Sequence, residues 1–433
     1  MDTQKGGASL GMRYFDDFFE IGNLAIMSKN TGNTSYDFDF RTPFVCSSIV
    51  SSCKSPILLR IGAIDNYADI ENELKKNGCI LWVDERSHIE CSTIENWYPL
   101  LKEHTPRTEV FDELPSIDVL EKKFKFPVFI KGNRQTSRHK RSQCIINNPD
   151  EYESLRNEWN KDDILFWQKV AIREYVPLKE IDSTSYPDMI PISYEFRFFY
   201  FLGKCVAHGP YWTLGKKYDL PKEEYEKVKE LTDWAEKQLS SAFVAIDVAQ
   251  TADGEWIIIE VNDAQESGYG GVNPISLWTG IVEIMDMKWN LTPFSELHQG
   301  TKSIYDYVKD GYTVPDKVIA YLRTQRYLGV CPGTYDHPFK PGERLPGPYR
   351  LTDGHYTWDR DTWKYVLKYH LTLPEDFINY VMSDDGDKKL TELVSELIEQ
   401  NESWSSSIKE IKKKQGYKCL LLGPEGNKEL RDF

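Results

Sequence analysis

The sequence lacks the features that would place the protein in a membrane or outside the cell. In its 433 residues no apolar run approaches the length of a membrane span, and residues 1–12 contain no apolar signal region. The eight cysteines include no CxxC pair and no cysteine–histidine metal spacing. We therefore expect a cytoplasmic protein whose cysteines are reduced thiols.

Other absences argue against several classes of nucleic-acid and nucleotide protein. The net charge of -15 opposes general nucleic-acid binding, which needs a basic surface. No GxxxxGK[ST] segment is present, so a P-loop is not the source of any phosphate binding. No Lys-x-Asp-Gly motif marks a nucleic-acid ligase. We expect neither a nucleic-acid partner nor a membrane partner.

What the sequence does contain predicts more than one domain. The chain is too long for one ordinary core, and its mixture of strand and helix patterns predicts a multidomain α/β fold with α+β character. In the first part, strands are expected at residues 57–61 and 79–83, with a helix at 68–76 between them. We divide the chain into an N-terminal α/β domain (1–120), a strand-rich domain (121–292) and a C-terminal module (293–433).

The sequence of the C-terminal module predicts secondary structure, but we find no catalytic or binding motif in it. Helices are expected at 361–369, 374–382 and 389–400, and a hairpin turn at 352–358. The module could recognise an acceptor substrate or a protein partner.

A hairpin is predicted late in the strand-rich domain. Residues 243–249 and 256–261 are typical of strands, and Asp253-Gly254 between them is the dipeptide preferred in a tight two-residue turn. Counting outward from that turn predicts which side chains of the two strands face each other.

The counted register brings acidic side chains together. Asp247 would lie opposite Glu260, with Cβ atoms about 5 Å apart, and Asn262 would project from the same face. Two facing carboxylates repel, so we expect a cation between them, and Mg²⁺ suits two carboxylates and an amide oxygen. The alternative is an edge hairpin with a solvated acidic face, against which the apolar residues on both faces argue.

A lysine and a basic run lie earlier in the same domain. Residues 127–132 predict an apolar strand that ends near Lys131, and the basic segment 133–143 follows, with Lys140 among its charges. Such a loop can close over phosphates and neutralise charge that develops during their transfer. The alternative is a solvated basic loop.

Two further segments complete the pattern. Residues 172–177 are followed, after a loop, by a predicted strand at 194–200, in which Glu195 and Arg197 share a face. An arginine beside a glutamate on a strand is also what a plain structural ion pair predicts.

Taken in this order, these residues resemble the ATP-grasp superfamily over roughly residues 126–290. Its recurring features are a strand lysine, a closing loop, an adenine-binding hinge and a late hairpin with metal-binding Asp, Glu and Asn. The sequence is most similar to the clade marked by one arginine and two lysines, which we assign to Arg197, Lys131 and Lys140. The position of an earlier lysine found in many members stays open: Lys102 and Lys123 are candidates, and Lys140 could take over its role.

The resemblance implies an ATP-grasp fold with an N-terminal pre-ATP-grasp domain, an appended C-terminal module, and ATP and Mg²⁺ as cofactors. The implied site residues are Glu174, Tyr175 and Val176 at the adenine; Glu195 at the ribose or a second metal; Lys131 and Lys140 at the phosphates; Asp247, Glu260 and Asn262 at Mg²⁺; and Arg197 with Lys140 in catalysis.

The implied activity is that of an ATP-dependent carboxylate–amine ligase. It would form an acyl phosphate on an amino acid, peptide or protein and release ADP and phosphate. The segment 173–176 and the Glu195–Arg197 strand are also similar to the ATP-grasp-like chaperone that assembles a eukaryotic translation initiation factor. An ATP- and Mg²⁺-binding partner module without ligase activity is therefore the alternative.

Overall fold

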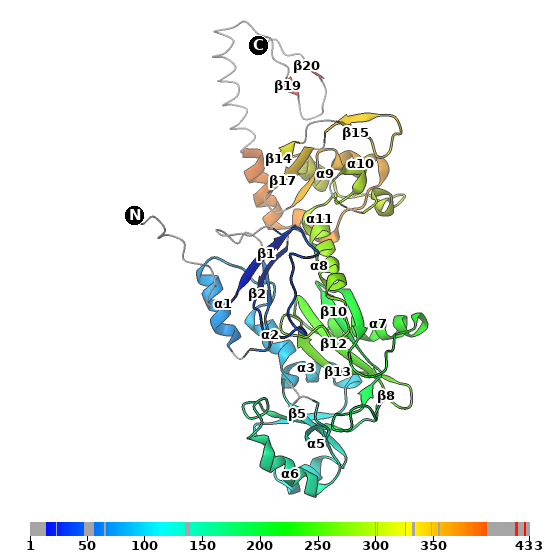
Figure 1. Ribbon diagram of the computed structural model, residues 1–433. Helices are drawn as coiled ribbons and strands as arrows, with labels where there is room; N and C mark the ends of the chain where they lie inside the picture. The colour runs from blue at the N-terminus through cyan, green and yellow to red at the C-terminus, as the bar shows by residue number, and fades with distance from the viewer. Residues whose placement is uncertain are drawn as a thin grey trace. The chain divides into compact units, whose positions relative to one another are not determined.

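The computed structural model describes residues 14–22, 24–46, 56–64, 66–134, 139–298, 300, 302–324, 326–330, 334–347, 349–353, 356–395, 421–422 and 428–429. The chain forms two compact units, Met1–Val282 and Glu283–Phe433, which run from blue to green and from yellow to red in Figure 1. Among the described residues no helix has both the length and the apolar character needed to cross a membrane.

The first unit begins with a small three-stranded sheet covered by helices. Strand β2 pairs antiparallel with β1 and parallel with β3. Asp84 caps the second helix by accepting a hydrogen bond from the Ser87 backbone N–H at 2.8 Å. The elements are β1 (Asp17–Ile21), β2 (Leu24–Ser28), β3 (Ile57–Arg60), α1 (Tyr67–Lys76), α2 (Glu85–Ser92), α3 (Ile94–Leu101) and η1 (Lys102–His104).

The predicted strand at 57–61 and helix at 68–76 are confirmed by β3 and α1. The predicted strand at 79–83 is wrong. Within that segment only Leu81 forms a bridge, parallel to Ile57, because the chain turns away after one pairing toward the capped start of α2.

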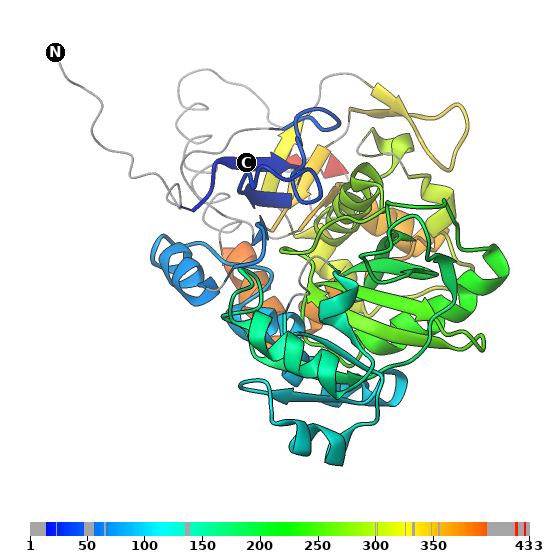
Figure 2. The ribbon, with the colours of Figure 1, turned by 60° about the horizontal axis from the view of Figure 1, so that its bottom comes forward.

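A four-stranded antiparallel sheet follows, with the order β4-β7-β5-β6. On one face Val128, Ile130 and Ile172 pack with Leu155 and Trp159 of α6 in an apolar core, and Figure 2 shows α6 along this sheet. Because strand side chains alternate, the opposite face carries Phe129, Lys131 and Arg173. The elements are β4 (Thr108–Phe111), α4 (Ile117–Lys123), β5 (Val128–Gly132), α5 (Arg141–Cys144), β6 (Ile145–Ile146), α6 (Pro149–Trp159) and β7 (Val170–Glu174).

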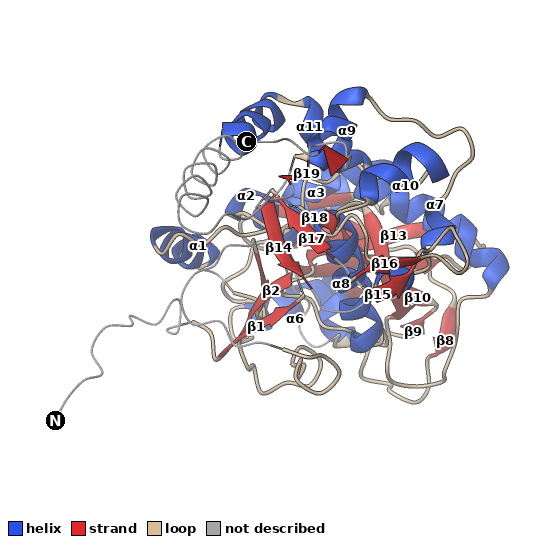
Figure 3. Ribbon diagram, turned by 90° about the horizontal axis from the view of Figure 1, so that it is seen from above, coloured by secondary structure: helices blue, strands red, loops and turns tan. Residues whose placement is uncertain are grey.

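A second four-stranded antiparallel sheet has the order β11-β10-β12-β13. Val228 and Ala235 of α7 pack with Phe198 and Ile246 of the sheet, and Figure 3 shows α7 beside its strands. Arg197 and Asp247 are direct neighbours on the other face. The elements are β8 (Glu180–Asp182), β9 (Ile192–Ser193), β10 (Glu195–Phe201), β11 (Lys204–Pro210), α7 (Lys222–Glu236), β12 (Phe243–Gln250), β13 (Trp256–Asp263) and α8 (Pro274–Trp289).

The turn between β12 and β13 differs from the predicted two-residue turn. The Thr251 backbone N–H donates to the Glu255 carbonyl at 2.7 Å, which leaves residues 252–254 as a three-residue turn. Gly254 has φ +97°, a conformation that glycine adopts without steric cost.

A bulge in β13 then restores the predicted register. Asp247 faces Glu260 but its neighbour Val248 faces Ile258, so Ile259 is the extra residue. The longer turn and the bulge each shift the register by one residue, in opposite directions. Asp247 therefore faces Glu260 as predicted, although the path to that pairing is different.

The second unit has its own aromatic core, built around Tyr321, Trp358, Tyr365 and Phe377. The helices predicted at 361–369 and 374–382 are confirmed, and β17 and β18 pair as the hairpin predicted around 352–358. The predicted helix at 389–400 is seen to residue 395, and the rest lies outside the described residues. The elements are η2 (Ser295–Leu297), η3 (Ile304–Tyr307), α9 (Asp316–Arg323), β14 (Arg326–Val330), β15 (Thr334–Asp336), β16 (Arg344–Pro346), β17 (Tyr349–Thr352), β18 (Thr357–Asp359), α10 (Thr362–Tyr369), α11 (Glu375–Met382), β19 (Leu421–Leu422) and β20 (Lys428–Glu429), with a further helix at 384–395.

Candidate functional site

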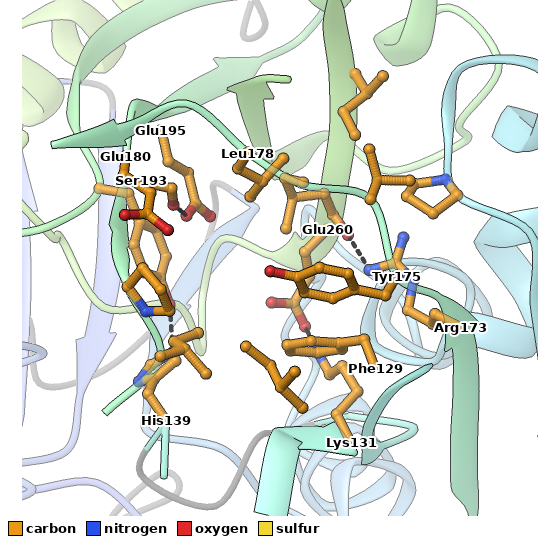
Figure 4. Close-up of a pocket in the computed structure, with 18 of the residues that line it drawn as sticks. Phe129, Lys131, His139, Arg173, Tyr175, Leu178, Glu180, Ser193, Glu195 and Glu260 are labelled. Carbon is orange, nitrogen blue, oxygen red and sulfur yellow. Dashed lines mark hydrogen bonds and ion pairs between the residues drawn. The ribbon is translucent and has the colours of Figure 1, made fainter. Parts of the chain in front are cut away.

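A pocket of about 900 Å³, counted to its open mouth, lies between the two four-stranded sheets of the first unit. The segment after β7 lines it between the sheets, and Figure 4 shows side chains from all three sources directed toward its interior. The lining includes Phe129, Lys131, Arg173, Glu174, Tyr175, Val176, Leu178 and Glu180 from the first sheet and the linking segment, His139 from the basic loop, and Ser193, Glu195, Tyr211, Trp212, Ile257, Ile259 and Glu260 from the second sheet and its connections.

An ion pair joins the two sheets across the pocket. Lys131 on β5 donates to the carboxylate of Glu260 on β13, and the lysine is buried while the glutamate side chain is 17% exposed. Burial opposes ionisation of Glu260, but Lys131, with Arg197 and Arg173, holds the pKa of that carboxyl below its usual value. Glu260 is therefore a carboxylate in the pocket, with one oxygen bound by Lys131.

A second ion pair lies within one sheet, on neighbouring strands. Arg197 donates through Nε and Nη2 to the two carboxylate oxygens of Asp247, at 2.7 and 2.6 Å. Its Nη1 donates to the Gly268 carbonyl at 2.5 Å. Burial opposes the charge of Arg197, but Asp247 raises the pKa of the guanidinium above its usual value. Neither residue lines the pocket, and Tyr211 lies between Arg197 and the interior.

Glu195 occupies a different environment from the other acids. Its Oε2 accepts hydrogen bonds from Ser193 Oγ at 2.9 Å and Trp212 Nε1 at 3.1 Å. Burial, followed by the charge of Asp247, raises the pKa of Glu195 to about 8. The carboxyl is therefore mostly protonated at neutral pH, and it faces the pocket as a hydrogen-bonding group rather than as a full negative charge.

The predicted hinge lines the pocket, although one backbone group is already engaged. The Glu174 backbone N–H donates to the Arg107 carbonyl at 2.8 Å. In Figure 4 the ring of Tyr175 reaches into the pocket near Phe129. Tyr175 and Val176 are partly buried pocket residues at the predicted adenine position.

Besides Arg197 and Asp247, two further predicted residues lie away from the pocket lining. The Lys140 side chain is 47% exposed, and its nearest acidic partner is Asp162 at 3.9 Å. Asn262 is partly buried on β13, opposite Ala245, two residues beyond Glu260. Residues 135–138 of the basic loop lie outside the described residues.

Sequence reasoning missed several pocket residues. Arg173 donates through Nη1 to the Ile259 carbonyl at 2.8 Å, and its buried Nη2 has no hydrogen-bond partner among the described residues. Burial lowers the pKa of Arg173 to about 10. An arginine inside the apolar strand 170–174 was the available signal. Glu180, His139, Tyr211 and Trp212 carry no comparable signal, because they lie in loops or at the ends of short strands.

The residues present partly fit Mg²⁺. Within the described residues, no three His, Cys, Asp or Glu side chains are grouped as a metal site. The repulsion predicted between Asp247 and Glu260 is offset here by Arg197 and Lys131. Glu260 and Asn262 offer hard oxygen donors on one strand face, and nucleotide phosphates commonly complete such a Mg²⁺ site. Asp247 would have to share its carboxylate with Arg197.

Two antiparallel four-stranded sheets enclose the pocket, and a lysine from one faces an acid from the other, as expected for an ATP-grasp domain. Residues 124–281 match the family model described as ATP-grasp domain, R-2-K clade family 3, and this part of the chain is an ATP-grasp domain. The match confirms the ATP-grasp fold predicted for this part of the chain. ATP-grasp enzymes use ATP and Mg²⁺, the two cofactors predicted from the sequence.

Solved structures with a similar arrangement include ATP-grasp ligases. D-alanine–D-alanine ligase from Bacillus anthracis, complexed with ATP, is 18% identical, with 53% of this chain and 78% of that chain covered and a TM-score of 0.40. An ATP-grasp RimK domain protein from Sphaerobacter thermophilus is 14% identical, with 53% and 78% covered and a TM-score of 0.37. L-amino acid ligase from Bacillus licheniformis is 14% identical, with 48% of each chain covered and a TM-score of 0.34. No curated protein matches the sequence.

Proposed function

We propose that the protein is an ATP-dependent carboxylate–amine ligase. It acts through an acyl phosphate on an amino acid, a peptide or a protein. The observation that supports this most is the Lys131–Glu260 pair, which joins the two sheets of an ATP-grasp domain across their shared pocket. A nucleoside triphosphate with its metal ion needs a cation to bind the phosphates and an acid to bind the metal, and the two walls of the pocket provide one of each.

The shape and chemistry of the pocket suit ATP. Phe129, Ile257 and Ile259 provide apolar walls for the adenine beside Tyr175 and Val176 of the hinge. The backbone groups of Val176 and the carbonyl of Glu174 would bind the polar edge of the base. Glu195, protonated near neutral pH, suits the hydroxyls of the ribose better than it suits a second metal ion.

The phosphates extend toward the charged part of the pocket. Lys131 would bind them, and Glu260 and Asn262 would hold Mg²⁺, with Asp247 behind them. When bound, Mg²⁺ neutralises charge on the phosphate oxygens. The exchange of Glu260 for phosphate as the partner of Lys131 keeps the buried ammonium paired in both states.

The reaction has two steps. A substrate carboxylate oxygen attacks the γ-phosphorus and the bond to the β–γ bridging oxygen breaks, which gives ADP and an acyl phosphate. A neutral amine then attacks the acyl carbon and phosphate leaves, which gives an amide, and the amine proton passes to solvent. Arg197 would steady charge during transfer from its position behind Tyr211, and the site contributes mainly positioning and electrostatic stabilisation.

The proposed domains are 1–120, 121–292 and 293–433. The first two would carry the pre-ATP-grasp and ATP-grasp functions, and the C-terminal module would recognise an acceptor or a protein partner. The protein is proposed to act in the cytoplasm.

The test is a screen for phosphate release. Purified protein with ATP and Mg²⁺ is incubated with amino acids, peptides and polyamines, and phosphate release that depends on both an added carboxylate and an added amine is expected. Mass spectrometry of the mixture should detect the amide. Tight ATP binding with no turnover in any mixture would contradict the ligase and favour the ATP-dependent partner module.

A further inference from the structure

Two neighbouring residues of the basic loop, His139 and Lys140, have their side chains in different environments. His139 lines the pocket, whereas Lys140 is exposed near Asp162. In Figure 4 His139 and Lys131 both lie along the lower part of the pocket, with Glu195 above His139. Among the described residues of the loop, the side chain that faces the nucleotide pocket is therefore an imidazole rather than an ammonium.

The backbone holds His139 in an uncommon conformation. Its φ is +55°, in the left-handed region that non-glycine residues rarely adopt. The Ile190 N–H donates to the His139 carbonyl at 2.9 Å, and the Arg141 N–H donates to the Asp188 carbonyl at 2.9 Å. Backbone strain fixed by flanking hydrogen bonds is frequent where a side chain must be held in a site.

The surroundings of the ring favour its neutral form in the absence of nucleotide. The Nε2 atom lies 3.3 Å from the Tyr211 hydroxyl, and the ring lies edge-on to Trp212 with centroids 5.0 Å apart. The other charged groups that act on it are Lys131 on β5, Arg197 on β10 and Glu260 on β13. Burial, reinforced by Lys131 and Arg197 and opposed by Glu260, lowers the pKa of His139 to about 4.

We propose that His139 is a contact of the loop with the triphosphate and that it takes up a proton from solvent when the nucleotide binds. The inference rests on the proposed binding of ATP. A triphosphate adds negative charge beside an imidazole on which two cations, Lys131 and Arg197, and one carboxylate, Glu260, already act. Nearby negative charge favours the protonated ring. The imidazolium then donates a charge-assisted hydrogen bond to a phosphate oxygen.

The protonation state can be observed directly. In protein labelled with ¹³C at histidine Cε1, eight histidines give signals, and His139→Gln identifies the signal of interest. In the free protein this signal should not titrate between pH 8 and pH 5. With Mg²⁺ and a non-hydrolysable imido analogue of ATP, it should titrate within that range. A signal that stays neutral throughout in the complex would overturn the inference.

Calorimetry gives a second readout. At pH 6, binding of the Mg²⁺-bound analogue in two buffers of different ionisation enthalpy should reveal proton uptake by the native protein. Most of this uptake should be lost in His139→Gln, together with roughly ten-fold in affinity, the size expected for one charge-assisted hydrogen bond. Equal uptake and affinity in the variant would overturn the role of His139.

Two matched variants sharpen this result. His208→Gln changes an exposed histidine on β11 that packs on Phe198 and Tyr225, and it should leave uptake and affinity as in the native protein. Lys140→Gln should reduce affinity less than His139→Gln does, and the reverse order would overturn the inference. If the native protein binds no analogue at all, the proposed function fails together with the inference.

Discussion

The two ion pairs of the site differ in their relation to the pocket: Lys131 and Glu260 line it, and Arg197 and Asp247 do not. Lys131 and Glu260 come from different sheets, and the glutamate is 17% exposed to the pocket. Arg197 and Asp247 come from adjacent strands of one sheet, Asp247 has no exposed surface, and both its oxygens are bound by the arginine.

The difference separates a pair that can exchange partners from one that is built into the sheet. A phosphate can replace Glu260 as the partner of Lys131, and a metal ion can bind Glu260, so that neither side chain is left without a partner of opposite charge. Opening the Arg197–Asp247 pair leaves a buried charge without a partner, which typically costs about 3–5 kcal/mol. We therefore expect ligand binding to depend most on the bridging pair, and folding to depend most on the pair within the sheet.

The largest expected effect comes from Glu260→Gln, which keeps the shape of the bridging acid and removes its charge. Phosphate release should fall by about a thousand-fold, the loss seen when one electrostatic contact to the transition state is removed. Steady-state phosphate assays at saturating Mg²⁺ measure this loss. Thermal denaturation should show a folded variant that ATP stabilises, because phosphate replaces the lost partner of Lys131.

The matched control is Glu255→Gln, next to the turn of the same hairpin and outside the pocket lining. It should keep native turnover. Full Mg²⁺-dependent activity in Glu260→Gln would show that Glu260 is not a metal ligand.

Arg197→Met tests the pair within the sheet. We expect turnover per folded molecule to fall by about two to three orders of magnitude, for a transition-state contact of roughly 3–4 kcal/mol, while ATP affinity stays within a few-fold. The melting temperature should also fall, because Asp247 loses its buried counter-ion. Adding Asp247→Asn should recover part of the melting temperature but none of the turnover.

A purely structural ion pair predicts another result for Arg197→Met. The melting temperature would fall, but turnover measured per folded molecule would stay native. That outcome would agree with a structural role for the pair within the sheet, and it would show that Arg197 has no role in catalysis.

Lys131→Ala tests the other member of the bridging pair. The dissociation constant for ATP should rise roughly ten- to hundred-fold, as expected for one charge-assisted contact. Lys140→Ala should also weaken binding, but less, because its side chain is half exposed beside Asp162. Isothermal calorimetry measures both constants, and an equal loss in the two variants would contradict the placement of Lys140 outside the pocket.

The facing of Asp247 and Glu260 could be predicted because hairpin pairing is local. The count from Asp253-Gly254 succeeded through two compensating differences, the longer turn and the bulge at Ile259. The bulged residue makes a tertiary contact, since Arg173 binds the Ile259 carbonyl from the other sheet. No pattern within the hairpin encodes that contact.

The orientation of the basic loop was beyond sequence reasoning. Lys140 carries the charge expected at a phosphate site, but loops have no periodicity from which a side-chain direction follows. The hydrogen bonds that turn His139 inward come from residues 188–190, about fifty positions later. Both ion pairs also join residues at least fifty positions apart in the sequence. The charges of the four residues marked them as candidates, but the sequence did not show which residue pairs with which.

The smallest expected effect concerns Glu195, whose pKa of about 8 is raised mainly by burial. Because this value lies above that of the unfolded chain, the folded protein binds more protons between about pH 4.5 and pH 8, and the free energy of unfolding falls as pH rises through that window. Glu195→Gln cannot ionise and should remove this dependence. Melting temperatures from pH 5.5 to 9 should show the native protein losing stability relative to the variant.

Glu180→Gln, at an exposed carboxylate of the same pocket, controls for the general loss of charge. A difference between native protein and Glu195→Gln that does not change with pH would mean that Glu195 is ionised in the folded state. The acid would then be available to a second metal ion, and the contrast between a neutral ribose side and a charged phosphate side of the pocket would be lost.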